Sequence, residues 1–150
     1  MADKIIATNR KARFNYTILE SLEAGIQLKG TEVKSLRGSE ASLADSFARL
    51  EGNEVFLYNM HIAPYEFGNI ANVDPKRPRK LLLHKSQIRR LVGEVATKKL
   101  ALIPLKIYFK NGIAKIELAL VKGKKAYDKR QAIKEKESER ELRRILRHRS

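Results

Sequence analysis

The sequence predicts a mainly β protein, an antiparallel barrel of about six short strands with about three short helices and a flexible C-terminal tail. Three segments alternate apolar and polar residues, which is typical of strands that are buried on one face only. An Asn-Gly pair separates the last two of these segments, and that pair is the strongest short signal of a β-hairpin. From Lys122 onward the alternation stops and charged residues dominate, which marks the tail.

The first alternating segment, from Tyr16 to Leu28, predicts one long strand or two strands bent at Gly25. Leu19 and Glu20 break the alternation, and a β-bulge or a strand end would absorb both. Just before this strand, the residues from Asn9 to Arg13 predict a short basic helix capped by Asn9.

The following residues predict a short helix from Gly30 to Leu36, capped by Thr31 and ended at Gly38. A hairpin comes next, with one strand over residues 46–50 and the other over residues 54–62.

Residues 64–78 combine proline, glycine and polar side chains, so we expect a loop there. The run Leu81 to Leu83 suits a short buried strand, and residues 86–98 predict a helix capped by Ser86.

The last two alternating segments, Ala101 to Phe109 and Ala114 to Leu120, are joined by Asn111-Gly112 and predict a hairpin. Pro104 is expected at an edge or a bulge, because it cannot donate a ladder hydrogen bond. A closed barrel resembling the OB fold is the arrangement that this element order favours.

The charge of the chain points to a polyanionic partner. Its 150 residues include 32 Lys and Arg against 17 Asp and Glu, which gives a formal net charge of +15. A charge of this size repels itself in the compact state, so a nucleic acid partner explains it better than a merely solvated, lysine-rich surface. No segment has the length of a signal peptide core or of a membrane span, and no cysteine is present, so we expect a cytoplasmic protein without membrane contact.

The tail differs in composition from the barrel. Residues 122–150 carry twelve Lys and Arg against five Asp and Glu, a net charge of +7, and have only one small apolar patch at helical spacing, Leu142, Ile145 and Leu146. A helix with so little apolar surface gains little by packing. We therefore predict a barrel over residues 1–122 and a tail over residues 123–150 that is disordered when free and helical on its partner; the alternative is a charged helix packed on the barrel.

The sequence gives no sign of catalysis. The three histidines, His61, His84 and His148, lie in no metal-binding or catalytic pattern, and no nucleotide-binding glycine motif or hydrolase motif occurs. We therefore expect a protein that is not an enzyme and that has no cofactor and no metal.

Basic residues cluster in three places. The first cluster lies around the residues from Lys76 to Arg90 and includes Arg79 and Lys80; the second, where the last strand ends, includes Lys124, Lys125, Lys129 and Arg130; the third comprises Arg10, Lys11 and Arg13. Each alone is consistent with a solvated surface, but together they favour nucleic acid. Tyr127, within the second cluster, offers a face for stacking on an unpaired base, which favours RNA.

Several motifs resemble those of the SmpB family of tmRNA-binding proteins. The resemblance is carried by Asn9-Arg-Lys-Ala-Arg13, by the block from Glu23 to Arg37, by Arg77-Pro-Arg-Lys-Leu-Leu-Leu-His84 and by Lys122-Gly-Lys-Lys-Ala-Tyr-Asp-Lys-Arg130. It implies an OB-fold monomer that binds the tRNA-like domain of tmRNA (SsrA RNA) and delivers it to stalled ribosomes for trans-translation. It also implies that the protein stands in place of an anticodon arm, while the tail probes the decoding centre and the empty mRNA channel of the small subunit.

The resemblance also implies roles for individual residues. Glu23, Leu82 and Lys115 match positions linked to tmRNA recognition. Asp128, Lys129 and Arg130 match the decoding-centre motif of the tail, and Ile145 and Leu146 match a late apolar pair. Tyr127 stands where some relatives have histidine, which preserves stacking but not a positive charge. The alternatives are an RNA-binding module of another kind, such as a ribosomal protein or an initiation-factor-like domain, a nuclease, or a protein scaffold.

Overall fold

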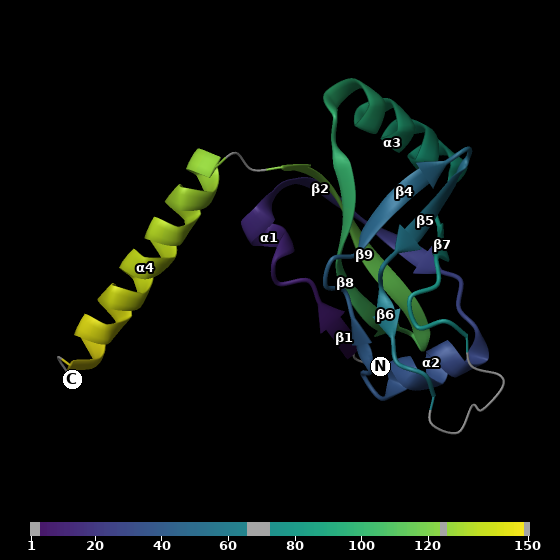
Figure 1. Ribbon diagram of the computed structural model, residues 1–150, viewed down its shortest axis with the longest axis horizontal. Coiled ribbons are helices and arrows are strands. Elements are labelled where there is room, and N and C mark those ends of the chain that lie inside the picture. The colour runs from purple at the N-terminus through teal and green to yellow at the C-terminus, as the bar shows by residue number, and fades with distance from the viewer. Residues whose placement is uncertain (1–3, 66–72, 124–125, 149–150) are drawn as a thin grey trace.

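The computed structural model describes residues 4–65, 73–123 and 126–148 (Figure 1). In the last of these ranges, side chains are described for Lys134 and for residues 136–146.

Six strands form a closed antiparallel ring. These strands are β2 (Tyr16–Ile26), β4 (Phe47–Glu51), β5 (Glu54–Tyr58), β7 (Arg79–Leu82), β8 (Ala101–Lys110) and β9 (Ile113–Gly123). They pair in the order β8-β4-β5-β7-β2-β9, and β9 pairs with β8 to close the ring. The prediction of a six-stranded antiparallel barrel is confirmed. Strand β1 (Lys4–Thr8), which the sequence did not predict, pairs with β8 outside the ring, and β3 (Ala41–Ser42) pairs separately with β6 (His61–Ile62).

The observed strand ends and bulges agree in part with those predicted from the sequence. The register shifts between Ile18 and Glu20 and again between Pro104 and Lys106, so both predicted bulges are confirmed. The hairpin turn at Asn111-Gly112 is also confirmed, with positive φ at both residues. In contrast, β2 ends at Ile26 rather than at Leu28, and the predicted strand over residues 54–62 divides into β5 and β6.

The barrel interior and part of its outer surface form separate apolar clusters. The interior is filled by alternate side chains of every ring strand, such as Leu57, Leu81, Ile107, Ile116 and Leu118, none of which is more than 1% exposed. The second cluster lies outside the ring and contains Ala12, Ile103, Leu105, Ala119 and Val121, with Tyr16, Ile18 and Phe47 packed against it. Ala119 and Val121 occupy outward positions of β9, in alternation with Leu118 and Leu120, which face the interior. Ile103 and Leu105 have the same parity as Ile107 in the sequence, but the bulge between Pro104 and Lys106 turns them to the outer surface while Ile107 faces the interior.

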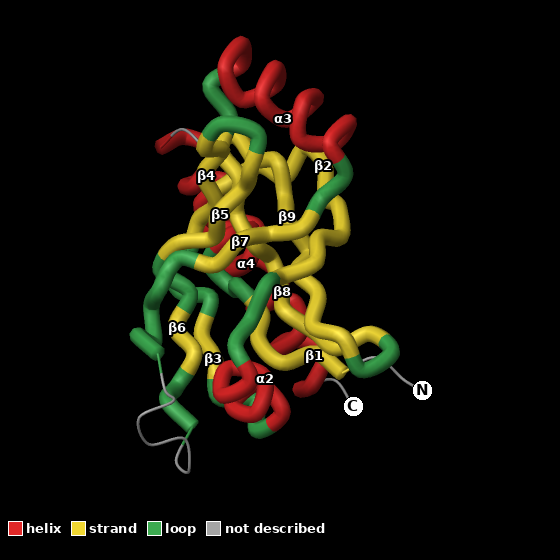
Figure 2. Tube along the Cα trace, turned by 90° about the vertical axis from the view of Figure 1, so that its right-hand side faces the viewer, coloured by secondary structure: helices red, strands yellow, loops and turns green. Residues whose placement is uncertain are grey.

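Four helices accompany the strands in the described residues: α1 (Ala12–Asn15), α2 (Gly30–Arg37), α3 (Lys85–Lys98) and α4 (Ala126–His148). Figures 1 and 2 show α3 and α2 at opposite ends of the barrel. In α3, Ile88 and Leu91 face inward, whereas Val92 is 41% exposed. Helix α4 begins at Ala126, shortly after the end of β9 in the chain, and extends away from the barrel (Figure 1).

The predicted N-caps are wrong by a few residues. The caps are Lys11, Lys29 and His84 rather than Asn9, Thr31 and Ser86. The Asn9 side chain instead donates to the carbonyl of Pro104 at 3.0 Å, so it ties β1 to β8. At α2 and α3 the side chain three residues into the helix accepts the backbone N–H of the cap residue: Glu32 from Lys29 and Gln87 from His84.

Candidate nucleic-acid interface

A groove of about 830 Å³ lies where β7, β2 and β9 run side by side, next to the start of α3. We call it the recognition groove. It is lined by Glu23, Lys80, Leu82 and Lys115, four of the five residues that the sequence analysis placed in RNA recognition on the barrel. The register explains why they meet: Gly25 of β2 stands opposite Leu82 of β7 on one side and opposite Lys115 of β9 on the other.

Leu82 lies on the surface of the groove. Its side chain is 51% exposed, whereas its neighbour Leu81 is 1% exposed, so the prediction that the three leucines form a buried strand holds only in part. Gly25 leaves room for the Leu82 side chain, because a Cβ on Gly25 would approach the Leu82 Cβ to 3.1 Å. An exposed aliphatic side chain on a strand is suited to packing on an unstacked base.

Glu23 is ionised and fixed in orientation at the edge of the groove. Its Oε2 accepts a hydrogen bond from the Tyr108 hydroxyl at 2.5 Å and another from Lys110 Nζ at 3.4 Å. The Tyr108 bond, together with the charges of Lys110 and Lys115, holds the pKa of Glu23 below its ordinary value. Among the described residues none bonds Oε1, so this oxygen can accept from a base edge or a ribose hydroxyl.

Lys80 and Lys115 supply positive charge on either side of Leu82. Lys115 occupies an outward position of β9 and is half-buried, while its neighbours Ala114 and Ile116 face the core. Lys80 forms an exposed ion pair with Glu54 at 3.2 Å, which a phosphate could replace at little cost because such exposed pairs contribute little stability.

Arg79 does not belong to the groove, and the sequence-based prediction that it binds RNA is corrected. Its side chain is fully buried, and its Nε lies 2.6 Å from Oε2 of Glu32. Its other nitrogens donate to the carbonyls of Met60 at 2.6 Å and Pro75 at 2.9 Å. Arg79 faces inward because the alternation along β7 turns Lys80 and Leu82 outward and Arg79 and Leu81 inward.

Sequence reasoning missed one prominent residue of the groove. Ile113 lines it and is 60% exposed. The signal was present, since an isoleucine directly after the Asn111-Gly112 turn occupies an outward position of its strand. With Leu82 it gives the groove two exposed aliphatic side chains.

The tail residues can be placed only in part. Lys124 and Lys125 lie outside the described residues. Tyr127, Asp128, Lys129 and Arg130 fall in the backbone of α4, but their side chains also lie outside what the structure describes. The apolar patch further along is described: Leu142, Ile145 and Leu146 are 59%, 45% and 56% exposed. The order of this segment in the free protein stays a prediction.

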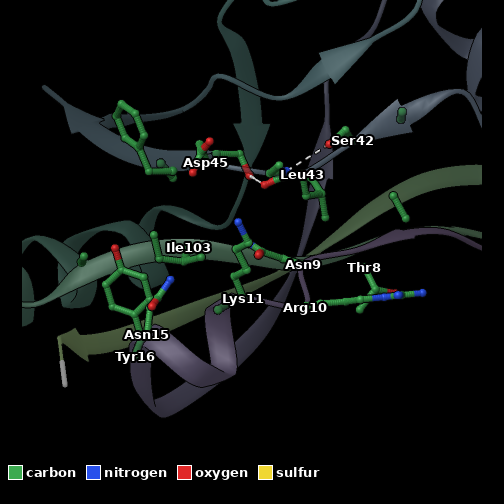
Figure 3. Close-up of a pocket in the computed structure, with 18 residues that line it drawn as sticks. Thr8, Asn9, Arg10, Lys11, Asn15, Tyr16, Ser42, Leu43, Asp45 and Ile103 are labelled. Carbon is green, nitrogen blue, oxygen red and sulfur yellow. Dashed lines mark hydrogen bonds between the residues drawn. The ribbon is translucent and has the colours of Figure 1, made fainter. Parts of the chain in front are cut away.

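A second groove, of about 620 Å³, lies on another part of the barrel between β1, α1 and the start of β4. Figure 3 shows Ile103, Asn15 and Tyr16 together at the left, Thr8 and Arg10 at the right, and Asn9 and Lys11 between them. The basic residues Arg10 and Lys11, which the sequence analysis grouped as a third cluster, belong to this groove and not to the recognition groove.

Two further findings concern metals and membranes. Within residues 4–65, 73–123 and 126–148, no three His, Asp or Glu side chains gather as metal ligands would. In the same part of the chain, none of the helices combines the length and the apolar character that a membrane crossing requires.

Three comparisons with known proteins find similarity to the same family. The model of the SmpB protein family matches residues 6–148. An SsrA-binding protein of Pelotomaculum thermopropionicum is 60% identical over 149 residues, which is 99% of this chain and 97% of that protein. The SsrA-binding protein of Caldicellulosiruptor saccharolyticus is 63% identical over 95% of this chain and 90% of its own length. A solved structure described as "tmRNA-SmpB: a journey to the center of the bacterial ribosome" has 60% identity and a TM-score of 0.66, covering 79% of this chain and 84% of that chain.

Proposed function

Since the chain belongs to the SmpB protein family, we propose that it binds the tRNA-like domain of the SsrA RNA (tmRNA) and delivers this RNA to stalled ribosomes for trans-translation. The proposed action is binding without chemical catalysis and takes place in the cytoplasm, where ribosomes work. The names of the relatives and of the similar ribosome-associated structure support this proposal.

The observation that carries the proposal is the composition of the recognition groove. It combines two exposed aliphatic side chains, Leu82 and Ile113, with an oriented carboxylate at Glu23 and with the ammonium groups of Lys80 and Lys115. Unpaired bases need apolar or aromatic surface to pack on, base edges and 2′-hydroxyls need hydrogen-bond acceptors, and phosphates need cations. The groove offers all three within one concave surface.

We further propose a division between barrel and tail at about residue 123. The barrel, held on tmRNA, would occupy the place of an anticodon arm, and residues 123–150 would enter the empty mRNA channel near the decoding centre. The exposed patch of Leu142, Ile145 and Leu146 supports a partner for α4, because three large aliphatic side chains face solvent along one helix. Lys124, Lys125, Tyr127, Asp128, Lys129 and Arg130 are the proposed contacts at the near end of the tail.

Replacing Leu82 with alanine is expected to weaken tmRNA binding about tenfold, because it removes an apolar contact from the centre of the interface.

Lys115→Gln is expected to weaken tmRNA binding less than Leu82→Ala does. It should also reduce the slope of log affinity against log salt concentration by the amount that corresponds to about one phosphate contact. Titration of labelled tmRNA at several salt concentrations measures both effects.

Ile5→Ala is the matched control for Leu82→Ala. Ile5 is an aliphatic residue with 56% exposure, close to that of Leu82, but it lies on β1 and lines neither groove. Unchanged tmRNA affinity in both groove variants would contradict the proposed recognition site.

A further inference from the structure

The outer face of strands β4, β5 and β7 carries three aromatic rings, which the proposed tmRNA site does not use. Cross-strand register places Phe47 opposite Tyr58, and Arg49 opposite Phe56, which in turn stands opposite Lys80. We call these five residues the aromatic strip. Alternation along each strand turns all five outward, while Ala48, Val55, Leu57 and Leu81 between them face the core.

The rings at Phe56 and Tyr58 are not part of the apolar packing of the barrel. Both are half-buried, and neither belongs to the interior cluster or to the outer cluster. Phe47 touches the outer cluster at one side. Aromatic rings on the outer face of a sheet that fill no core are characteristic of a binding face.

Two of the rings and one arginine are already stacked. The rings of Phe47 and Tyr58 lie parallel, with centroids 5.6 Å apart and planes 16° from each other. The Arg49 guanidinium lies over both, 5.5 Å from the Phe47 centroid and 5.8 Å from that of Tyr58. A guanidinium in contact with a ring keeps its N–H donors, and these can bind phosphate.

The aromatic strip connects the two grooves. Phe47 lines the second groove with Tyr16, and Lys80 lines the recognition groove with Leu82. Successive outward residues on a strand are roughly 6.8 Å apart, so the distance from the row of Tyr58 to the row of Leu82 is about 14 Å. The same face also carries Glu51, which accepts a hydrogen bond from the Tyr58 hydroxyl, and Glu54, which pairs with Lys80. A span of this length fits about two or three nucleotides of an extended strand.

We propose that the aromatic strip is a second RNA-binding site that stacks unpaired nucleotides, with Tyr58 and Phe56 as base platforms and Arg49 and Lys80 as phosphate contacts. Sheet faces with exposed aromatic residues bind single-stranded RNA in this way, and OB barrels present a sheet face of this kind to oligonucleotides. The site adds to the proposed function and does not use Glu23, Leu82 or Lys115. Its nucleotides come from tmRNA, next to the segment in the recognition groove, because Lys80 belongs to both surfaces.

Tyr58→Ala is expected to weaken binding of a short oligoadenylate RNA about tenfold, because one stacked base is lost. Arg49→Gln is expected to weaken oligoadenylate binding less than Tyr58→Ala does. It should also reduce the slope of log affinity against log salt concentration by about one phosphate contact. Arg37→Gln is the control for Arg49→Gln, since Arg37 is an exposed arginine on α2 that lines neither groove, and its affinity is expected to stay unchanged.

A tryptophan variant distinguishes stacking from a structural role of the ring. The chain contains no tryptophan, so Tyr58→Trp introduces a single indole signal. Stacking predicts that this variant keeps the wild-type affinity and that its fluorescence is quenched when oligoadenylate is added. Thermal melts of each variant check that the barrel is folded.

Two further titrations identify the source of the nucleotides. Tyr58→Ala is expected to weaken binding of tmRNA; weaker binding of small ribosomal subunits with unchanged tmRNA affinity would mean that the strip holds ribosomal RNA and would overturn tmRNA as the source. Wild-type affinity of Tyr58→Ala for oligoadenylate, tmRNA and ribosomal subunits, with no quenching in Tyr58→Trp, would overturn the inference. The proposed function would stand in that case as long as Leu82→Ala still weakens tmRNA binding.

Discussion

Replacing Glu32 with alanine is expected to lower the free energy of unfolding by about 3–5 kcal/mol, because it leaves the buried guanidinium of Arg79 without its counter-charge. The Glu32 carboxylate is 4% exposed and receives Arg79 Nε at 2.6 Å, a bond from Arg77 and the backbone N–H of Lys29 at 2.8 Å. It thus joins α2 to β7 and to the segment before it. Urea denaturation followed by circular dichroism measures the loss.

The matched control is Lys80→Gln. Lys80 is the neighbour of Arg79 on β7, but its ion pair with Glu54 is exposed at both partners. We expect a change below about 1 kcal/mol for this variant. Equal stability of Glu32→Ala and the wild type would show that the buried pair does not hold α2 to the barrel.

The same carboxylate makes stability depend on pH. Burial alone raises the pKa of Glu32, but the bonds from Arg77, the Lys29 backbone and Arg79 outweigh it, so the pKa lies below its ordinary value of 4.5. A group with a lowered pKa in the folded state stabilises the fold above its unfolded pKa, and this contribution is lost as pH falls through the folded pKa. The advantage of the wild type over Glu32→Gln should therefore be full at neutral pH and decline below about pH 4.5.

Ending the chain at Gly123 is expected to abolish tagging on stalled ribosomes and to leave tmRNA binding within about threefold of the wild type. The cut keeps β9 complete, because Lys122 and Gly123 still pair with Thr17 and Tyr16 of β2. It removes residues that carry a net charge of about +6, so part of the non-specific attraction to RNA is lost along with the tail.

Titration with tmRNA and a tagging assay on stalled ribosomes measure the two activities separately. In the full-length chain, combined substitution of Ile145 and Leu146 by alanine tests the apolar patch of α4 without removing charge. This variant should bind tmRNA as the wild type does and tag poorly. Loss of tmRNA binding in the shortened chain would mean that the division at about residue 123 is wrong.

The barrel was predictable from the sequence because its main determinants are local. Alternation along β8 and β9, the Asn111-Gly112 turn and the two bulges can each be recognised within about ten residues. Strand β1 was missed because its five residues, Lys4 to Thr8, do not alternate, and only the partner β8 stabilises them. The caps of α2 and α3 were misplaced because Glu32 and Gln87 accept the backbone N–H groups of Lys29 and His84, so each helix begins after a residue that has no capping hydroxyl.

The sequence indicated several residues of the recognition groove, but it could not show which of their neighbours belong to the same groove. Family resemblance indicated Glu23, Leu82 and Lys115, and only the register of β2 with β7 and β9 shows that they share one groove. The sequence alone could not show which side chains of the basic cluster around Arg79 are buried and which are exposed. Inward and outward positions alternate along β7, and which set faces the core depends on how that strand sits in the barrel. The aromatic strip was equally hidden, since Phe47 and Tyr58 meet only through pairing of β4 with β5.

The most direct test of the account is site-specific crosslinking on the assembled, tmRNA-loaded ribosome. The chain has no cysteine, so Leu82→Cys and Leu142→Cys each place a single photoreactive label on an exposed position, one in the recognition groove and one on α4. We predict that the label at position 82 crosslinks to the tRNA-like domain of tmRNA and that the label at position 142 crosslinks to small-subunit ribosomal RNA. Crosslinks from position 82 to ribosomal RNA alone, or from position 142 to the tRNA-like domain alone, would contradict it.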